Sequence, residues 1–215
     1  MLTQGTIGPI TTSTSISPGL QAPTRLGNLG DAIVSELHGR YYETSYRRAL
    51  FSGSQQAASV TTAGVISSAT SYTGLCLYNP IGNTFNAVIN KVGVAFPVAP
   101  AAATIYGIQV GQSAVAPTAS TAVTAGPKNL FINGASPTSG LYSAITFTLT
   151  ASAVITHVLG FVGTVAAAST GQDAGIFDLE GGIIVPPGCF AAIYTSTVAN
   201  TAGFLGSISW EEIPV

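Results

Sequence analysis

The sequence predicts an all-β fold: an antiparallel β-sandwich, jelly-roll-like, preceded by an extended N-terminal arm. Three observations lead to this prediction. From about residue 59 onward, short apolar segments follow one another, and glycine, proline and asparagine separate them. The clearest of these segments alternate apolar and polar residues with a period of two, which is typical of strands. No stretch after residue 50 has a helical period.

The N-terminal region is predicted to be an extended arm. Residues 1–30 contain six threonines, three serines, five glycines and three prolines. Such a composition cannot bury enough apolar surface to fold alone, so we expect the arm to become ordered only against another surface. We therefore assign residues 1–50 to the arm and a short ordered connector, and residues 51–215 to the β-sandwich domain.

The connector contains the densest cluster of ionisable residues in the chain. Asp31 could cap a short helix, but Gly39 interrupts the segment, and the tyrosines that follow favour a strand, so the type of element stays open. Tyrosine and arginine are enriched at protein–protein interfaces, and three tyrosines within six residues are costly to leave in water. The alternative is a solvated connector. We predict an interface formed by Arg40, Tyr41, Tyr42, Tyr46, Arg47 and Arg48.

Two segments of the sandwich domain have the clearest strand pattern. Residues 143–149 alternate strictly, which predicts a half-buried antiparallel strand. The apolar face of this strand consists of Ile145, Phe147 and Leu149. Near the C-terminus, Phe204, Ile208 and Trp210 share one face of another strand. We therefore expect Trp210, the only tryptophan, to lie in the core.

The remaining strands are predicted from shorter apolar runs between turn residues. These runs are residues 85–96, 104–110, 129–132, 153–162, 182–185 and 189–195. Residues 110–127 (VGQSAVAPTASTAVTAGP) are low in complexity, and we expect them to form a long surface loop.

Charged residues are scarce and unevenly placed. They make up 7% of the chain, against about 25% in an ordinary soluble domain, and the net charge is −2. Between residues 49 and 172 the only charged side chains are Lys91 and Lys128. A free monomer relies on mixed surface charge to stay dispersed. We interpret the scarcity as a surface covered by copies of the chain or by another protein; a coat of serine, threonine and asparagine is the alternative.

Composition also argues against several classes of partner. No apolar run approaches the ~20 residues of a membrane span. With six basic residues in total, the chain lacks the basic face that direct nucleic-acid binding requires. Cys76 and Cys189 are far apart, each in an apolar run, which favours buried free thiols and synthesis in a reducing cytoplasm.

Catalytic and metal-binding patterns are weak. If residues 153–162 alternate, His157 shares a face with Ile155, Leu159 and Phe161, which favours a core or interface histidine over a catalytic base. The chain has no G-x-S-x-G, C-x-x-C or H-E-x-x-H motif. Asp173, Asp178 and Glu180 could hold a calcium ion together with backbone carbonyls, but we prefer to interpret them as a solvated strand rim. We predict no enzymatic activity, no metal and no cofactor.

Three stretches together carry a resemblance to a known class of protein. They are SELHGRYYETSYRRALF (35–51), LYNPIGNTFNAVINKVGVAF (77–96) and FDLEGGIIVPPGCFAAIYTSTVANTAGFLGSISWEEIPV (177–215). They resemble virion structural proteins of tailed bacteriophages, in particular jelly-roll decoration proteins. The resemblance covers about a third of the chain, and none of these stretches is a catalytic signature.

This resemblance implies a structural protein of the virion, made in the host cytoplasm. We expect a homo-oligomeric capsid decoration (cement) protein, a homotrimer, that stabilises a phage head and contacts the major capsid protein or another virion protein. The alternative is a host-binding or adaptor module on a head or tail fibre, with its loops meeting a glycan. A hydrolase of cell-surface polymer would need a pair of carboxylates, and the sequence supplies no convincing pair.

Overall fold

The structure is a computed structural model of the chain. It describes residues 5–6, 24–25, 39–56, 65–68, 71–97, 100, 102–163, 174–196 and 203–215. The chain divides into two compact units, Met1–Tyr42 and Glu43–Val215. In the first unit, β1 (Gly5–Thr6) pairs in parallel with β2 (Thr24–Arg25). Most of the predicted arm lies outside the described residues.

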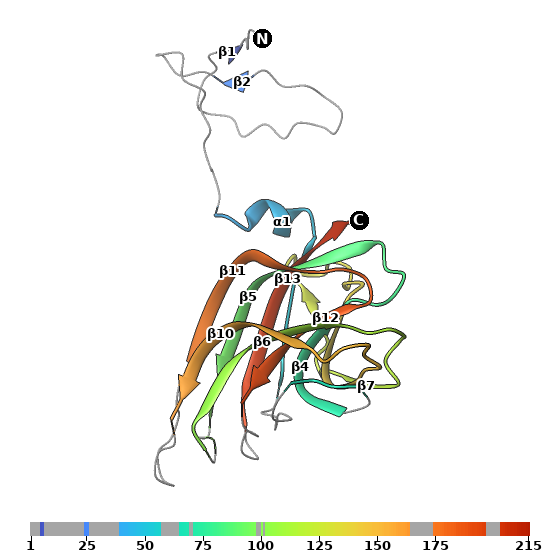
Figure 1. Cartoon of the computed structure of the whole chain (residues 1–215). Helices are drawn as coiled ribbons and strands as arrows, with labels where there is room; N and C mark the ends of the chain where they lie inside the picture. Colours follow the sequence, from blue (N-terminus) through green and yellow to red (C-terminus); the bar gives the residue numbers. More distant parts are fainter. Residues whose placement is uncertain are drawn as a thin grey trace. The chain divides into compact units, whose positions relative to one another are not determined.

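The second unit is a sandwich of two antiparallel sheets, which confirms the predicted fold class (Figure 1). One sheet has six strands in the order β10-β6-β12-β4-β9-β7, and the other has five in the order β11-β5-β13-β3-β8. The elements are α1 (Tyr42–Tyr46), β3 (Leu50–Ser54), β4 (Ser71–Tyr78), β5 (Phe85–Ala95), β6 (Thr104–Gln112), β7 (Ala119–Ala122), β8 (Lys128–Asn129), β9 (Gly140–Thr146), β10 (Val154–Val162), β11 (Ala174–Val185), β12 (Cys189–Thr195) and β13 (Leu205–Pro214).

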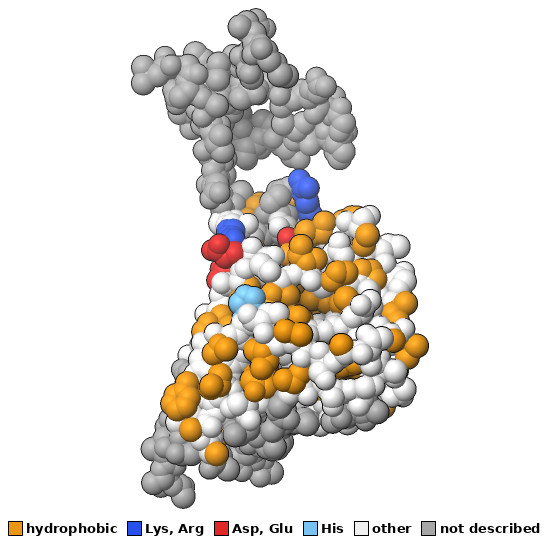
Figure 2. All heavy atoms as spheres, viewed as in Figure 1, with side chains coloured by type: hydrophobic (Ala, Val, Ile, Leu, Met, Phe, Trp, Pro, Cys, Tyr) orange, Lys and Arg blue, Asp and Glu red, His pale blue; other side chains and the backbone are white. Residues whose placement is uncertain are grey.

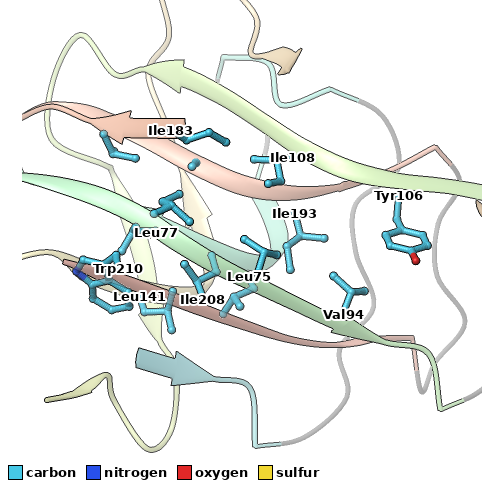
Figure 3. Packing of buried hydrophobic residues seen from close by; sticks show 14 of the residues in the cluster. Leu75, Leu77, Val94, Tyr106, Ile108, Leu141, Ile183, Ile193, Ile208 and Trp210 are labelled. Atoms are coloured by element: carbon cyan, nitrogen blue, oxygen red, sulfur yellow. The ribbon is translucent and has the colours of Figure 1, made fainter. Parts of the chain in front are cut away.

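The main core lies between the two sheets, where apolar side chains of both inner faces interdigitate (Figure 3). Phe204, Ile208 and Trp210 are all buried in it, so the predicted inward face of the C-terminal strand is confirmed. The Trp210 ring packs against Phe51 of the neighbouring strand β3, with 6.1 Å between ring centroids. This core sets the relative position of the two sheets.

A second apolar cluster involves the six-stranded sheet and the segments next to β9 and β10. Ile145, Phe147 and Leu149 are buried in it, as the alternation of residues 143–149 predicts. The Phe147 ring stacks on Phe190 of β12, with 4.1 Å between centroids and 13° between planes. Cys76 is buried in the same cluster.

The structure differs from the sequence prediction in four places. The run 129–132, predicted as a strand, contributes only Asn129 to β8, and residues 130–132 form an exposed loop. The predicted loop 110–127 contains the short strand β7, which pairs with β9. Strands β3 and β4 were not predicted, because Gly53 and Gly74 interrupt the apolar pattern on which strand prediction depends.

Two β-bulges overturn the predicted alternation of β10. The register against β6 shifts between Ile155 and His157, and again between Val158 and Gly160. Each bulge adds one residue to β10, so side chains three positions apart point to the same face. Val158 lies opposite Gly107 and His157 lies opposite Ile108, so these neighbours face opposite ways. Strict alternation would place His157 on the same face as Ile155 and Phe161. In the structure His157 lies on the opposite face of the strand.

Candidate interaction surfaces

The predicted interface residues fall on both sides of the division between the two units. In the first unit, the Arg40 guanidinium carbon lies 5.5 Å from the centroid of the Tyr41 ring, and Tyr42 is exposed. In the second unit, Tyr46 is 61% exposed and Arg47 and Arg48 are both exposed. The structure therefore does not place all six residues on one described surface.

Arg48 contacts an exposed surface that was not predicted from the sequence. Its guanidinium carbon lies 4.7 Å from the centroid of the Phe131 ring, a cation–π contact with a loop 83 positions further along the chain. Leu130, Phe131 and Ile132 are all exposed on this loop, and Ile132 is 84% exposed. We call residues 130–132 the knob. Their apolar character led to the incorrect prediction of a strand.

Hydrogen bonds hold the knob in a defined conformation. The Leu130 amide donates to the Leu50 carbonyl (2.9 Å), and the Phe131 amide donates to the Asn129 side-chain oxygen (2.8 Å). The Asn129 side-chain nitrogen donates to the Arg48 carbonyl (2.7 Å). Asn133 follows the knob in the left-handed region (φ 68°), which asparagine tolerates better than most residues. The knob is therefore preorganised, and ordering it on binding costs little entropy.

A buried carboxylate fixes the chain that follows the knob. Glu212 lies on the inward face of β13, and its two oxygens accept three hydrogen bonds. The Ser139 amide donates to Oε1 (2.7 Å), and the Thr138 amide (3.0 Å) and hydroxyl (2.9 Å) donate to Oε2. Hydrogen bonds to an ionised acceptor are among the stronger ones in proteins.

Replacing Glu212 with alanine should lower the free energy of unfolding by about 2–4 kcal/mol, because two backbone amides lose their acceptor in a poorly solvated site. Urea denaturation followed by tryptophan fluorescence measures this change. Glu211→Ala is the matched control, since the neighbouring carboxylate faces the opposite side of β13 and is half exposed. We expect that control to change stability by less than about 0.5 kcal/mol. Equal losses in both variants would contradict the structural role of Glu212.

The two edges of the sandwich are unequal. On one side, the edge strands β7 and β8 have four and two residues, and short edge strands resist pairing with other chains. On the other side, β10 has nine residues and β11 has twelve. Proteins protect long edge strands with lysine, proline or bulges; β10 has bulges but no lysine or proline. β11 is also interrupted, by a register shift between Asp178 and Ile183, so strand pairing at this side is limited and its length and exposed side chains are what distinguish it. We call the β10 and β11 side the open edge.

Exposed apolar side chains lie along the open edge. Figure 2 shows hydrophobic side chains spread over the face that contains β10 and its neighbours. The exposed members on β6, β10 and β11 are Ile105, Val154, Ile155, Val158, Phe161, Ile176 and Ile184. The register places Ile105, Ile155, Val158 and Phe161 together on the outer face of the six-stranded sheet, whereas Ile176 and Ile184 lie on the outer face of the other sheet. A group of exposed apolar side chains on one face, such as the first four, indicates a contact surface.

A groove of about 490 Å³ lies along this edge, between β10 of one sheet and β11 of the other. Val154, Ile184 and Val185 contribute apolar lining, and Gln112, Thr156 and His157 contribute polar groups. No aspartate, glutamate, lysine or arginine is among the residues that line it. His157 Nδ1 lies 3.1 Å from the Thr156 hydroxyl. The groove therefore suits an uncharged, mainly apolar occupant.

No protein-family model, curated protein or solved structure matches this chain.

The described residues do not form a recognisable catalytic constellation. Burial raises the pKa of the Cys76 thiol well above its usual value, and it also raises the pKa of Cys189, so neither thiol is activated as a nucleophile. Within the described ranges, His, Cys, Asp and Glu side chains do not gather in groups of three that could hold a metal ion. The helical residues described here include no stretch with the length and hydrophobicity of a membrane span.

Proposed function

We propose that this chain is a structural virion protein: a homo-oligomeric decoration protein on the head of a tailed bacteriophage. In this proposal it binds copies of itself, as a homotrimer, and the major capsid protein or another virion protein, and it has no enzymatic role. The resemblance of residues 35–51, 77–96 and 177–215 to phage virion proteins supplies the type of particle.

The observation that carries the proposal is the open edge. A long, uncharged edge strand with exposed apolar side chains is a liability for a free monomer, because it invites association. In a permanent assembly the same surface would stabilise the contact between subunits, because obligate interfaces are more apolar than ordinary protein surface. The scarcity of charge between residues 49 and 172 supports the same interpretation.

The buried tryptophan weighs against the alternative of a glycan-binding fibre module. Glycan sites are usually built on exposed aromatic platforms, of which tryptophan is a frequent member, and the only tryptophan of this chain is fully buried in the sandwich core. The exposed tyrosines described, Tyr42 and Tyr46, fall in different units of the chain. We therefore prefer the decoration protein to the host-binding or adaptor module.

Two measurements test the proposal. Light scattering on the purified full chain should give a multiple of the monomer mass of 21.6 kDa at micromolar concentration. An antibody against the chain, coupled to gold, should label the outside of phage heads from the source culture in electron micrographs. A stable monomer at all concentrations, together with unlabelled heads, would contradict the proposal. Label confined to tail tips would favour the fibre module instead.

A further inference from the structure

We propose that copies of this chain associate head-to-tail, with the knob of one copy inserted into the open-edge groove of the next. The occupant of the groove is thus a second copy of the same chain. This inference rests on the self-association in the proposed function, but not on the identity of the particle that the protein decorates.

The topology separates the two surfaces in the way that a head-to-tail contact needs. The five-stranded sheet runs from β11 at one edge to β8 at the other, and the knob directly follows β8. The groove is bounded by β11, so the knob and the groove lie at opposite edges of one sheet. A chain with complementary surfaces at opposite edges forms heterologous contacts, which close into a ring when the rotation between copies allows it.

The two surfaces also match in apolar character. Ile132, the most exposed large hydrophobic residue described, has the aliphatic side chain that the groove walls at Val154 and Ile184 would accommodate. The groove volume of about 490 Å³ lies within the range of pockets that bind small apolar groups, so it has room for the knob's aliphatic side chains. Binding would remove exposed apolar surface from water on both copies at once.

Charges flanking the two surfaces have opposite signs. Arg48 lies next to the knob, over the Phe131 ring, and it is exposed. On β11, the exposed Asp178 and Glu180 come shortly before Gly182, where the groove lining begins, and Asp178 pairs across the strands with Lys91 of β5. The Glu180 amide donates to Asp178 Oδ1 (3.0 Å), so both acidic residues belong to one turn. Such flanking charges would orient the knob towards the groove and select the register of the contact.

The test uses two variants, one that disables the knob and one that disables the groove. Ile132→Asp places a charge on the knob, and Val154→Asp places a charge in the groove, where Val154 is 63% exposed. Val115→Asp is the matched control, because Val115 is 50% exposed and belongs to neither surface. All three sites are exposed, so circular dichroism and urea midpoints should show that each variant folds like the unsubstituted chain.

Light scattering gives the decisive readings. We expect Ile132→Asp and Val154→Asp each to have the monomer mass of 21.6 kDa, while Val115→Asp keeps the mass of the unsubstituted assembly. An equimolar mixture of the two monomeric variants should form a complex of two chains and no larger species. In that complex, the intact knob of the groove variant occupies the intact groove of the knob variant, and no second contact can form.

The outcomes separate this inference from the proposed function. If the unsubstituted chain is a monomer, both self-association and the head-to-tail contact are overturned. If it is an oligomer that both aspartate variants leave intact, only the head-to-tail contact is overturned. If the variants are monomeric but their mixture does not pair, the two residues do not meet in one contact, and the inference fails.

Discussion

Replacing Trp210 with alanine should lower the free energy of unfolding by about 3–5 kcal/mol, the largest loss we expect from a single core substitution in this chain. Trp210 is fully buried, and its ring packs against Phe51 where β3 and β13 meet. Removing the indole leaves a cavity between the two sheets that a close-packed interior fills only partly. Denaturant unfolding followed by far-UV circular dichroism measures the loss without relying on tryptophan fluorescence.

The Trp210→Phe variant separates the contribution of ring packing from that of the indole N–H. The indole N–H is buried and has no hydrogen-bond partner among the described residues, so phenylalanine removes an unsatisfied donor while keeping most of the ring contact. We expect Trp210→Phe to cost less than half as much as Trp210→Ala. A phenylalanine variant as unstable as the alanine variant would mean that the indole N–H makes a hydrogen bond that the structure lacks.

Gly107→Ala should be the most damaging of the conservative glycine substitutions, at about 2–3 kcal/mol. A Cβ at this position of β6 would overlap the carbonyl oxygen of His157 on the bulged strand β10. Because the obstacle is backbone rather than a flexible side chain, β10 as a whole must move outward. Hydrogen exchange should then rise along residues 154–162, while β12 and β4 at the centre of the sheet stay protected.

Gly163→Ala is the control for this effect. A Cβ there would meet only the Phe161 ring, at 3.8 Å, which is ordinary van der Waals contact. We expect this variant to have the stability and the hydrogen exchange of the unsubstituted chain, within about 0.5 kcal/mol. Equal effects at the two glycines would show that β10 does not approach β6 as closely as the structure places it.

The fold class could be predicted from the sequence because the strands with the clearest alternation have one face in the core and the other towards solvent. Ile145 and Phe147, and likewise Ile208 and Trp210, alternate with polar or small residues, and this period survives in the structure. The details of β10 could not be predicted, because a bulge inserts a residue without a reliable signature in a single sequence. One inserted residue reverses the direction of every side chain that follows it.

The candidate surfaces were harder to predict, for two separate reasons. The knob is an apolar run, and an apolar run does not by itself show whether its side chains are exposed. Here a hydrogen bond from the Asn129 side chain to the Arg48 carbonyl helps to turn the chain out of the sheet after the two residues of β8. The groove depends on Val154 and Ile184, which are thirty positions apart and meet only because both belong to edge strands. Of the six residues predicted to form an interface, Arg48 lies beside the knob.

The place of β13 in its sheet has a consequence for biosynthesis. It is the last strand of the sandwich along the chain, yet it lies between β5 and β3, and residue 207 pairs with residue 54. While a ribosome is still making residues 1–204, the two halves of this sheet have no strand to join them. The nascent chain therefore cannot complete its hydrophobic core, and folding must follow translation of residue 214. Contacts so distant in sequence form slowly, so newly made chains spend a comparatively long time open to chaperones and to aggregation.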